Sequence, residues 1–144
     1  EFTVVGLCAA FSPDGRLFAF SDETIHLWQF SNDSDGEQTG ISGTEILTIP
    51  NAISETFSPD GSQLAGISGN DIKIWDAATG RELYTLTGHT GWVMGLAFSP
   101  NGRSLASTSL DGTVRIWSIS PGNETVAVSV AGAGYGNRVA YNPN

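Results

Sequence analysis

The sequence predicts an all-β protein built from a repeated unit of four short antiparallel strands. One turn-like pentapeptide occurs three times, as FSPDG at 11–15 and 57–61 and as FSPNG at 98–102. Each copy is followed by an alternating run that ends on tryptophan: TIHLW at 24–28, DIKIW at 71–75 and TVRIW at 113–117. Self-similarity at a period of about forty residues is typical of a repeat array, and no longer window shows a helical period.

The elements of one unit follow from its local chemistry. Ser-Pro-Asp-Gly suits a type I turn, because proline fixes φ and glycine tolerates the exit from the turn. The stretches around the turn alternate or are β-branched, which is typical of strands. In the third copy this pattern predicts four strands, at roughly 92–98, 103–109, 113–118 and 124–130.

The unit resembles the WD repeat at several coupled positions. In the third copy Gly88-His89 opens the unit, Phe98-Ser99-Pro100 lies in its middle, Leu110-Asp111-Gly112 occupies a hairpin turn and Trp117 closes it. The literal Trp-Asp dipeptide occurs once, at Trp75-Asp76. The resemblance covers almost the whole chain and implies a β-propeller, in which each blade is a four-stranded antiparallel sheet beside a central channel.

The resemblance therefore implies one propeller segment, 1–144, of about 3.5 WD repeats. Its parts are expected at about 3–49 for blade one, 52–87 for blade two, 92–130 for blade three and 136–142 for the first strand of a fourth blade. Propellers have about four to eight blades, so the ring is incomplete in one chain. It can be completed by the rest of a longer chain, which the expected strand count favours, or by further copies of this chain.

A polar network is expected inside blade three. The resemblance assigns the hydrogen-bonded chain of WD repeats to His89, Ser107, Asp111 and Trp117, and the donors and acceptors of these side chains match in that order. The competing interpretation, a Ser-His-Asp nucleophile, needs an exposed serine and an oxyanion hole. Ser107 lies inside an expected strand instead. We therefore predict a structural network and no catalytic residues.

The other reactive side chains favour structural interpretations as well. His26 aligns with Lys73 and Arg115 in the third strand of each unit, which predicts a solvent-facing side chain. Cys8 is the single cysteine, so an intrachain disulfide is excluded and packing is expected. The acidic stretch 31–44 lacks the first and twelfth ligands of a calcium loop. We therefore expect no metal and no cofactor.

A partner-binding rim is expected at Trp92, Met94, Leu110 and Tyr135, because the corresponding slots of WD-repeat propellers often face their partners. Large aromatic residues and methionine are also enriched in interface hot spots. The alternative is that Trp92 and Tyr135 cap the core. The first strands themselves are apolar, and their residues, Ala9 among them, are expected in the core.

The charge balance limits the partners. Six lysines and arginines stand against 15 acidic residues, a net charge of −9, which argues against nucleic acid. No apolar run reaches the ~18 residues of a membrane span. We expect a non-catalytic protein–protein interaction scaffold, cytoplasmic, with secretion left open. The alternatives are a propeller segment of a larger signalling or enzymatic protein, and a part-propeller that completes its ring as an oligomer.

Overall fold

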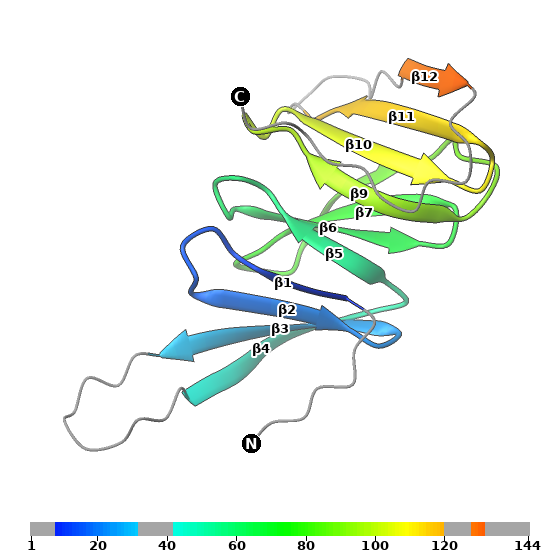
Figure 1. The fold of residues 1–144 in the computed structure, drawn as a ribbon. Coiled ribbons are helices and arrows are strands. Elements are labelled where there is room, and N and C mark those ends of the chain that lie inside the picture. The colour runs from blue at the N-terminus through cyan, green and yellow to red at the C-terminus, as the bar shows by residue number, and fades with distance from the viewer. Residues whose placement is uncertain (1–7, 32–41, 120–127, 132–144) are drawn as a thin grey trace.

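The computed structural model describes residues 8–31, 42–119 and 128–131, and these residues form three four-stranded antiparallel sheets (Figure 1). We call the sheets blades one, two and three. Blade one contains β1 (Cys8–Phe11), β2 (Leu17–Ser21), β3 (Thr24–Ser31) and β4 (Ser42–Pro50). Blade two contains β5 (Ile53–Phe57), β6 (Gln63–Ser68), β7 (Asp71–Asp76) and β8 (Glu82–Leu86). Blade three contains β9 (Val93–Phe98), β10 (Ser104–Ser109), β11 (Thr113–Ser118) and β12 (Val128–Ala131).

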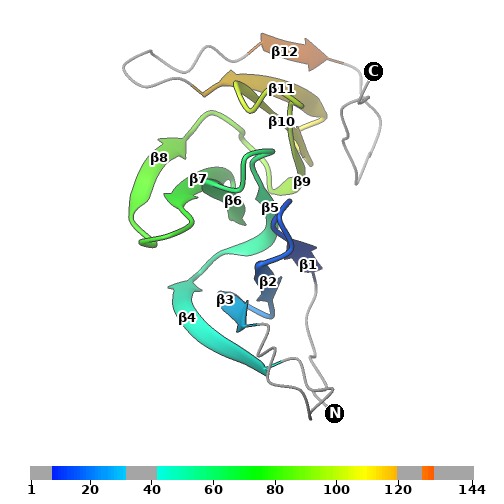
Figure 2. The same ribbon diagram turned by 90° about the vertical axis from the view of Figure 1, so that its left-hand side faces the viewer.

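Consecutive strands pair in each blade, and the three blades stack on one another in chain order. The first strands are neighbours, since β5 contacts both β1 and β9. Figure 2 shows these three strands close together, with β4 and β8 on the outer side of their sheets. The expected strand at 136–142 lies outside the described residues. Within the described residues, no helix is long and apolar enough to span a membrane.

The turn between the first and second strands has the same geometry in every blade. Its serine hydroxyl accepts the N–H of the residue five positions later at 2.9 Å, in the pairs Ser12–Leu17, Ser58–Gln63 and Ser99–Ser104. The glycine at its end has positive φ, +73° at Gly61, which other residues rarely adopt. The repeated pentapeptide is therefore a repeated strand connection.

The core lies between the blades. One face of each blade, which we call the leading face, carries the phenylalanine of the repeated turn and the closing tryptophan; the opposite face is the trailing face. The leading face of blade two, with Phe57, Leu64 and Trp75, packs on the trailing residues Ile25 and Leu27 of blade one. The leading face of blade three packs in the same way on the trailing residues of blade two: Ile67, Ile72 and Ile74.

Two sequence-based expectations are wrong in blade one. Ala9 is exposed rather than buried, because it lies on the leading face, which no preceding blade covers among the described residues. His26 is not a fully solvated side chain: only 25% of it is exposed, and its Nδ1 lies 2.5 Å from Oε1 of Glu45. Its ring stacks on Phe20 at a centroid distance of 4.8 Å.

Candidate functional site

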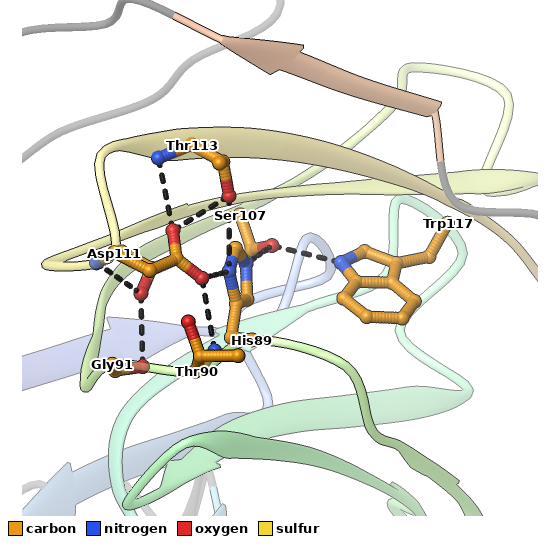
Figure 3. Close-up of polar contacts among 8 residues, drawn as sticks. His89, Thr90, Gly91, Ser107, Asp111, Thr113 and Trp117 are labelled. Atoms are coloured by element: carbon orange, nitrogen blue, oxygen red, sulfur yellow. Dashed lines mark hydrogen bonds and ion pairs between the residues drawn. The ribbon is translucent and has the colours of Figure 1, made fainter.

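Two strands and two connecting segments bring four polar side chains together in blade three. His89 comes from the loop between β8 and β9, Ser107 from the middle of β10, and Trp117 from β11. Asp111 lies in the tight turn between β10 and β11. Figure 3 shows the four side chains as a continuous chain of contacts.

The contacts fix the direction of every hydrogen bond. Trp117 Nε1 donates to Ser107 Oγ at 2.8 Å, Ser107 Oγ lies 2.8 Å from His89 Nε2, and His89 Nδ1 lies 2.7 Å from Asp111 Oδ2. Because indole N–H only donates, the serine accepts it and gives its own proton to Nε2. The imidazole then carries its proton on Nδ1 and donates it to the carboxylate. All donors in the chain are matched, which makes a buried network of this kind rigid.

The carboxylate of Asp111 accepts several hydrogen bonds. Burial alone would raise its pKa, but donors from three residues outweigh this and hold the pKa well below its ordinary value. These donors are the hydroxyl of Thr113 at 2.6 Å, the imidazole of His89, and the backbone N–H groups of Thr113 and Thr90 at 2.9 and 3.0 Å. Asp111 is therefore ionised and ties the turn to the loop that opens the blade.

Sequence reasoning did not find the contacts of Thr90, Gly91, Ser109 and Thr113. Gly91 passes so close to the turn that a Cβ there would lie 2.7 Å from the backbone nitrogen of Asp111. Ser109 Oγ donates to the carbonyl of Gly91 at 2.8 Å. The signal that could have revealed them is the cluster of small and hydroxyl residues that surrounds His89 and Asp111 in the sequence.

The network has the interatomic distances of a catalytic triad, but a substrate cannot reach its serine. A nucleophilic serine must meet a substrate carbonyl beside an oxyanion hole. The side chain of Ser107 is completely buried, and its Oγ already accepts the indole N–H of Trp117. The arrangement can therefore hold the blade together but offers no route for acyl transfer.

Two of the residues predicted to form a partner-binding rim, Trp92 and Leu110, are next in sequence to members of this site. Trp92 and Leu110 are large apolar side chains that are 66% and 52% exposed. Their backbones are joined, since Leu110 N donates to the carbonyl of Trp92 at 2.9 Å. Met94 is half-buried, and Tyr135 lies outside the described residues. Trp92 follows Gly91 and Leu110 precedes Asp111, so the network fixes the two segments that carry the exposed side chains.

Comparison with known proteins places the chain in a family. The family model "WD domain, G-beta repeat" matches residues 3–29, 43–76 and 80–118. The chain belongs to the WD40 repeat family. Its all-β fold of four-stranded antiparallel blades, incomplete in one chain, is thereby confirmed.

The WD40 segment is similar to much longer proteins. It is 38% identical over 118 residues to nuclear distribution protein PAC1 of Arthroderma benhamiae, covering 78% of this chain and 25% of that protein. It is 32% identical over 114 residues to a chromatin assembly factor 1 subunit FAS2 homolog of Oryza sativa subsp. japonica, covering 77% and 23%. The chain thus spans about a quarter of the length of these curated relatives.

Solved structures give the same fold. The WD40 repeats of RRP9 match with a TM-score of 0.72 and 26% identity, over 92% of this chain and 40% of that one. The structure of U3-55K matches with the same TM-score and identity, over 92% and 41%.

The other two WD40 blades lack the network, and blade two holds a different buried polar group. Gly66 of blade two and Phe20 of blade one stand where blade three has Ser107. Glu55, in β5, is only 4% exposed, and neither of its carboxyl oxygens has a hydrogen-bond partner. Burial raises its pKa, against weaker opposing effects of its own backbone N–H and of the nearby Ser21 hydroxyl. Sequence analysis did not single out Glu55. Among the described residues, no three His, Cys, Asp or Glu side chains are grouped to hold a metal ion.

Proposed function

We propose that this WD40 segment is a non-catalytic scaffold whose rim, formed by Trp92, Met94, Leu110 and Tyr135, binds partner proteins. WD40 repeat proteins generally mediate protein–protein interaction. The observation that carries the proposal is the pair of exposed apolar side chains, Trp92 and Leu110, on segments that a buried network holds rigid. An exposed tryptophan on a backbone segment that is already ordered loses little backbone entropy when it binds, which favours a hot spot.

The wider setting of the rim belongs to the same proposal. The segment comprises blades at about 3–49, 52–87 and 92–130 and the start of a fourth at about 136–142, and further blades close its ring. The net charge of −9 favours a protein partner over nucleic acid. We place the protein inside the cell, since its relatives include a nuclear distribution protein and a chromatin assembly factor subunit.

A library of displayed peptides, selected on the purified chain, tests the rim. Peptides selected on the native chain are measured by calorimetry against Trp92→Ala, which is expected to weaken binding by ~2 kcal/mol or more because it removes an anchoring aromatic. Leu110→Ser should weaken the same peptides. Both variants should keep the native circular dichroism, since both side chains are more than half exposed.

Ile46→Ser is the matched control. Ile46 is another exposed large apolar residue, 42% exposed on β4 of blade one, and its replacement should leave peptide binding unchanged. Equal losses in the Ile46 and Trp92 variants would contradict a specific rim. Unfolding of Trp92→Ala would show that the indole belongs to the core.

A further inference from the structure

The strands of the three blades end at two ends of the described molecule. One end, which we call the rim end, consists of the turns between the second and third strands of each blade and the connections from one blade to the next (Figure 1). It carries the two exposed side chains of the rim, Trp92 and Leu110. The other end, which we call the opposite end, consists of the turns between the first and second strands and the described turn between β7 and β8.

The rim end is exposed even where a blade has neighbours on both sides. Blade two lies between blades one and three, and Gly69 and Asn70 in its β6–β7 turn are exposed. Trp92 lies where blades two and three meet, because the N–H of Val93, next to it, donates to the carbonyl of Gly69 at 3.1 Å. The indole is therefore 66% exposed beside both of the blades that adjoin it.

The charged residues are divided unequally between the two ends. Among the described residues, the rim end has four carboxyl side chains and no lysine or arginine; they belong to Asp22, Glu23, Asp71 and Asp111. The opposite end mixes both signs, with the acidic residues Asp14, Asp60, Asp76 and Glu82 and the basic residues Arg16, Arg81 and Arg103. Charges of one sign on one surface attract ligands of the other sign, so the rim end favours a cationic partner.

The carboxylates of the two ends also differ in what they contact. At the opposite end, Asp60 accepts the hydroxyls of Ser58 and Ser62 at 2.6 and 2.8 Å and so holds its own turn. At the rim end, the carboxylates of Glu23 and Asp71 take part in no hydrogen bond or ion pair with the described residues. These two charges therefore contribute no contact to their turns and are available to a partner.

The cations nearest the middle of the blades do not neutralise the rim end. Lys73, in the middle of β7, pairs with Glu82 of the opposite end at 2.7 Å. Arg115, in the middle of β11, is half-buried, and its guanidinium lies 5.8 Å from the centre of the Trp117 ring. The loop that opens blade three lies against this guanidinium, since a Cβ at Gly88 would be 2.6 Å from its Nη1. Both side chains come from strands rather than from the turns of the rim end.

Trp92 lies between two turns that combine an apolar and an acidic character. The β10–β11 turn is joined to it by the N–H of Leu110, which donates to the carbonyl of Trp92 at 2.9 Å, and this turn also holds the ionised Asp111. The β6–β7 turn, on the side of blade two, ends at Asn70 and Asp71. A segment that packs an apolar side chain on Trp92 and Leu110 therefore passes the turn that carries Asp71.

We propose that the rim binds a cationic segment of its partner, in which an apolar or aromatic side chain packs on Trp92 and Leu110 and flanking lysine or arginine side chains meet the carboxylates of the rim end, Asp71 first among them. This inference rests on the proposed scaffold function and adds the chemistry of the partner to it. Arginine suits the site best, because a guanidinium binds carboxylates and also stacks on an indole. Charges around an apolar anchor chiefly raise the rate of association.

Two libraries of displayed peptides test the charge preference. Both carry a central leucine or phenylalanine; the flanking positions are Lys, Arg, Gly and Ser in one library and Asp, Glu, Gly and Ser in the other. Selection on the purified chain should enrich peptides of the cationic library whose binding is lost in Trp92→Ala. Enrichment of acidic peptides that depend on Trp92 would overturn the cationic partner and leave the scaffold function standing.

Asp71→Asn locates the effect, and Asp60→Asn is its matched control. Each variant removes one negative charge, and the turn of Asp60 accepts asparagine, since Asn101 occupies the same position in blade three and accepts the hydroxyl of Ser99 at 2.8 Å. Asp71→Asn should lower the association rate constant of a selected cationic peptide about twofold to fivefold, whereas Asp60→Asn should leave it nearly unchanged. The two ends are about 20 Å apart, the length of a six-residue strand, so at ~0.1 M salt the opposite end is screened from the peptide. Equal losses in the two variants would mean that the peptide responds only to net charge and would overturn the proposal.

Salt dependence separates this inference from the scaffold function. The association rate constant of the cationic peptide should fall about tenfold between ~0.05 and ~0.5 M salt, and a peptide with every Lys and Arg replaced by Gln should bind more weakly and respond little to salt. Equal binding of the two peptides, with both lost in Trp92→Ala, would refute the charge preference alone. Binding that does not depend on Trp92 would refute the scaffold function and this inference together. Circular dichroism confirms that each variant is folded.

Discussion

Asp111 carries a single charge that serves two purposes in blade three. Its carboxylate accepts the imidazole proton that completes the chain from Trp117, and it accepts the backbone N–H groups of Thr90 and Thr113. The first contact orders the interior of the blade, and the second ties the β10–β11 turn to the opening loop. Because these donors stabilise the ionised form, they hold the pKa of this carboxyl well below its ordinary value of 3.8.

Asp111→Ala is expected to lower the free energy of unfolding by ~2–4 kcal/mol, because it leaves a buried imidazole and two backbone N–H groups unpaired. Urea denaturation at neutral pH measures the loss. The stabilisation from the lowered pKa is present above pH ~4 and disappears as the pH falls below that range, so the native protein should approach the variant in acid. Asp22→Ala is the control, since Asp22 occupies the equivalent turn of blade one but is exposed; an equally large loss there would contradict a special role for Asp111.

Glu55 differs from Asp111: its carboxyl is buried without hydrogen-bond partners, so we expect it to destabilise the fold. Blades one and three carry Ala9 and Leu96 at this position, so Glu55→Leu should raise the free energy of unfolding at pH 7 by ~1–3 kcal/mol. A raised pKa in the folded state means that stability falls as the pH rises above the ordinary value of 4.5. Denaturation between pH 4 and 8, in steps of about one unit, should show this decline in the native chain and not in Glu55→Leu or Glu55→Gln. A pH dependence shared by all three would mean that other groups cause it.

At the scale of the strands, the repeat predicted the strands and turns, and the resemblance to the WD repeat predicted the polar network. The turn chemistry of FSPDG and the alternating runs before each tryptophan determine where strands begin and which face of each is buried, and the sheets follow. The side chains of His89, Ser107, Asp111 and Trp117 meet because the pattern places them on neighbouring strands and loops of one blade. These features depend on sequence positions close to one another, so a single copy of the unit already contains the information.

The features that escaped prediction depend on contacts between units. Ala9 lies in an apolar first strand, which predicts a core position. It is exposed, because burial of a leading face needs a preceding blade. His26 aligns with Lys73 and Arg115, but in blade one the ring stacks on Phe20, a residue that the other blades replace with Gly66 and Ser107. The environment of Glu55 depends on the facing blade in the same way. Periodicity within a unit does not report which faces a neighbour covers.

For the molecule as a whole, the stack of blades implies unequal local stability. In the part of the chain that the structure describes, the blades pack on their neighbours in chain order, so stability is approximately a sum over blades and the interfaces between them. Blade two has both faces covered: Leu64 on its leading face and Ile72 and Ile74 on its trailing face are completely buried. Among the described residues, blades one and three each have one such interface. The middle blade should therefore open last.

Hydrogen exchange measured by mass spectrometry tests this order. The amides of β6 and β7 should exchange more slowly than those of β2, β3, β10 and β11, since local opening costs least where a face is uncovered. Asp111→Ala should accelerate exchange in β10 and β11 and leave β2 and β3 nearly unchanged. Equal exchange in all three blades would instead describe a segment that unfolds as one cooperative unit.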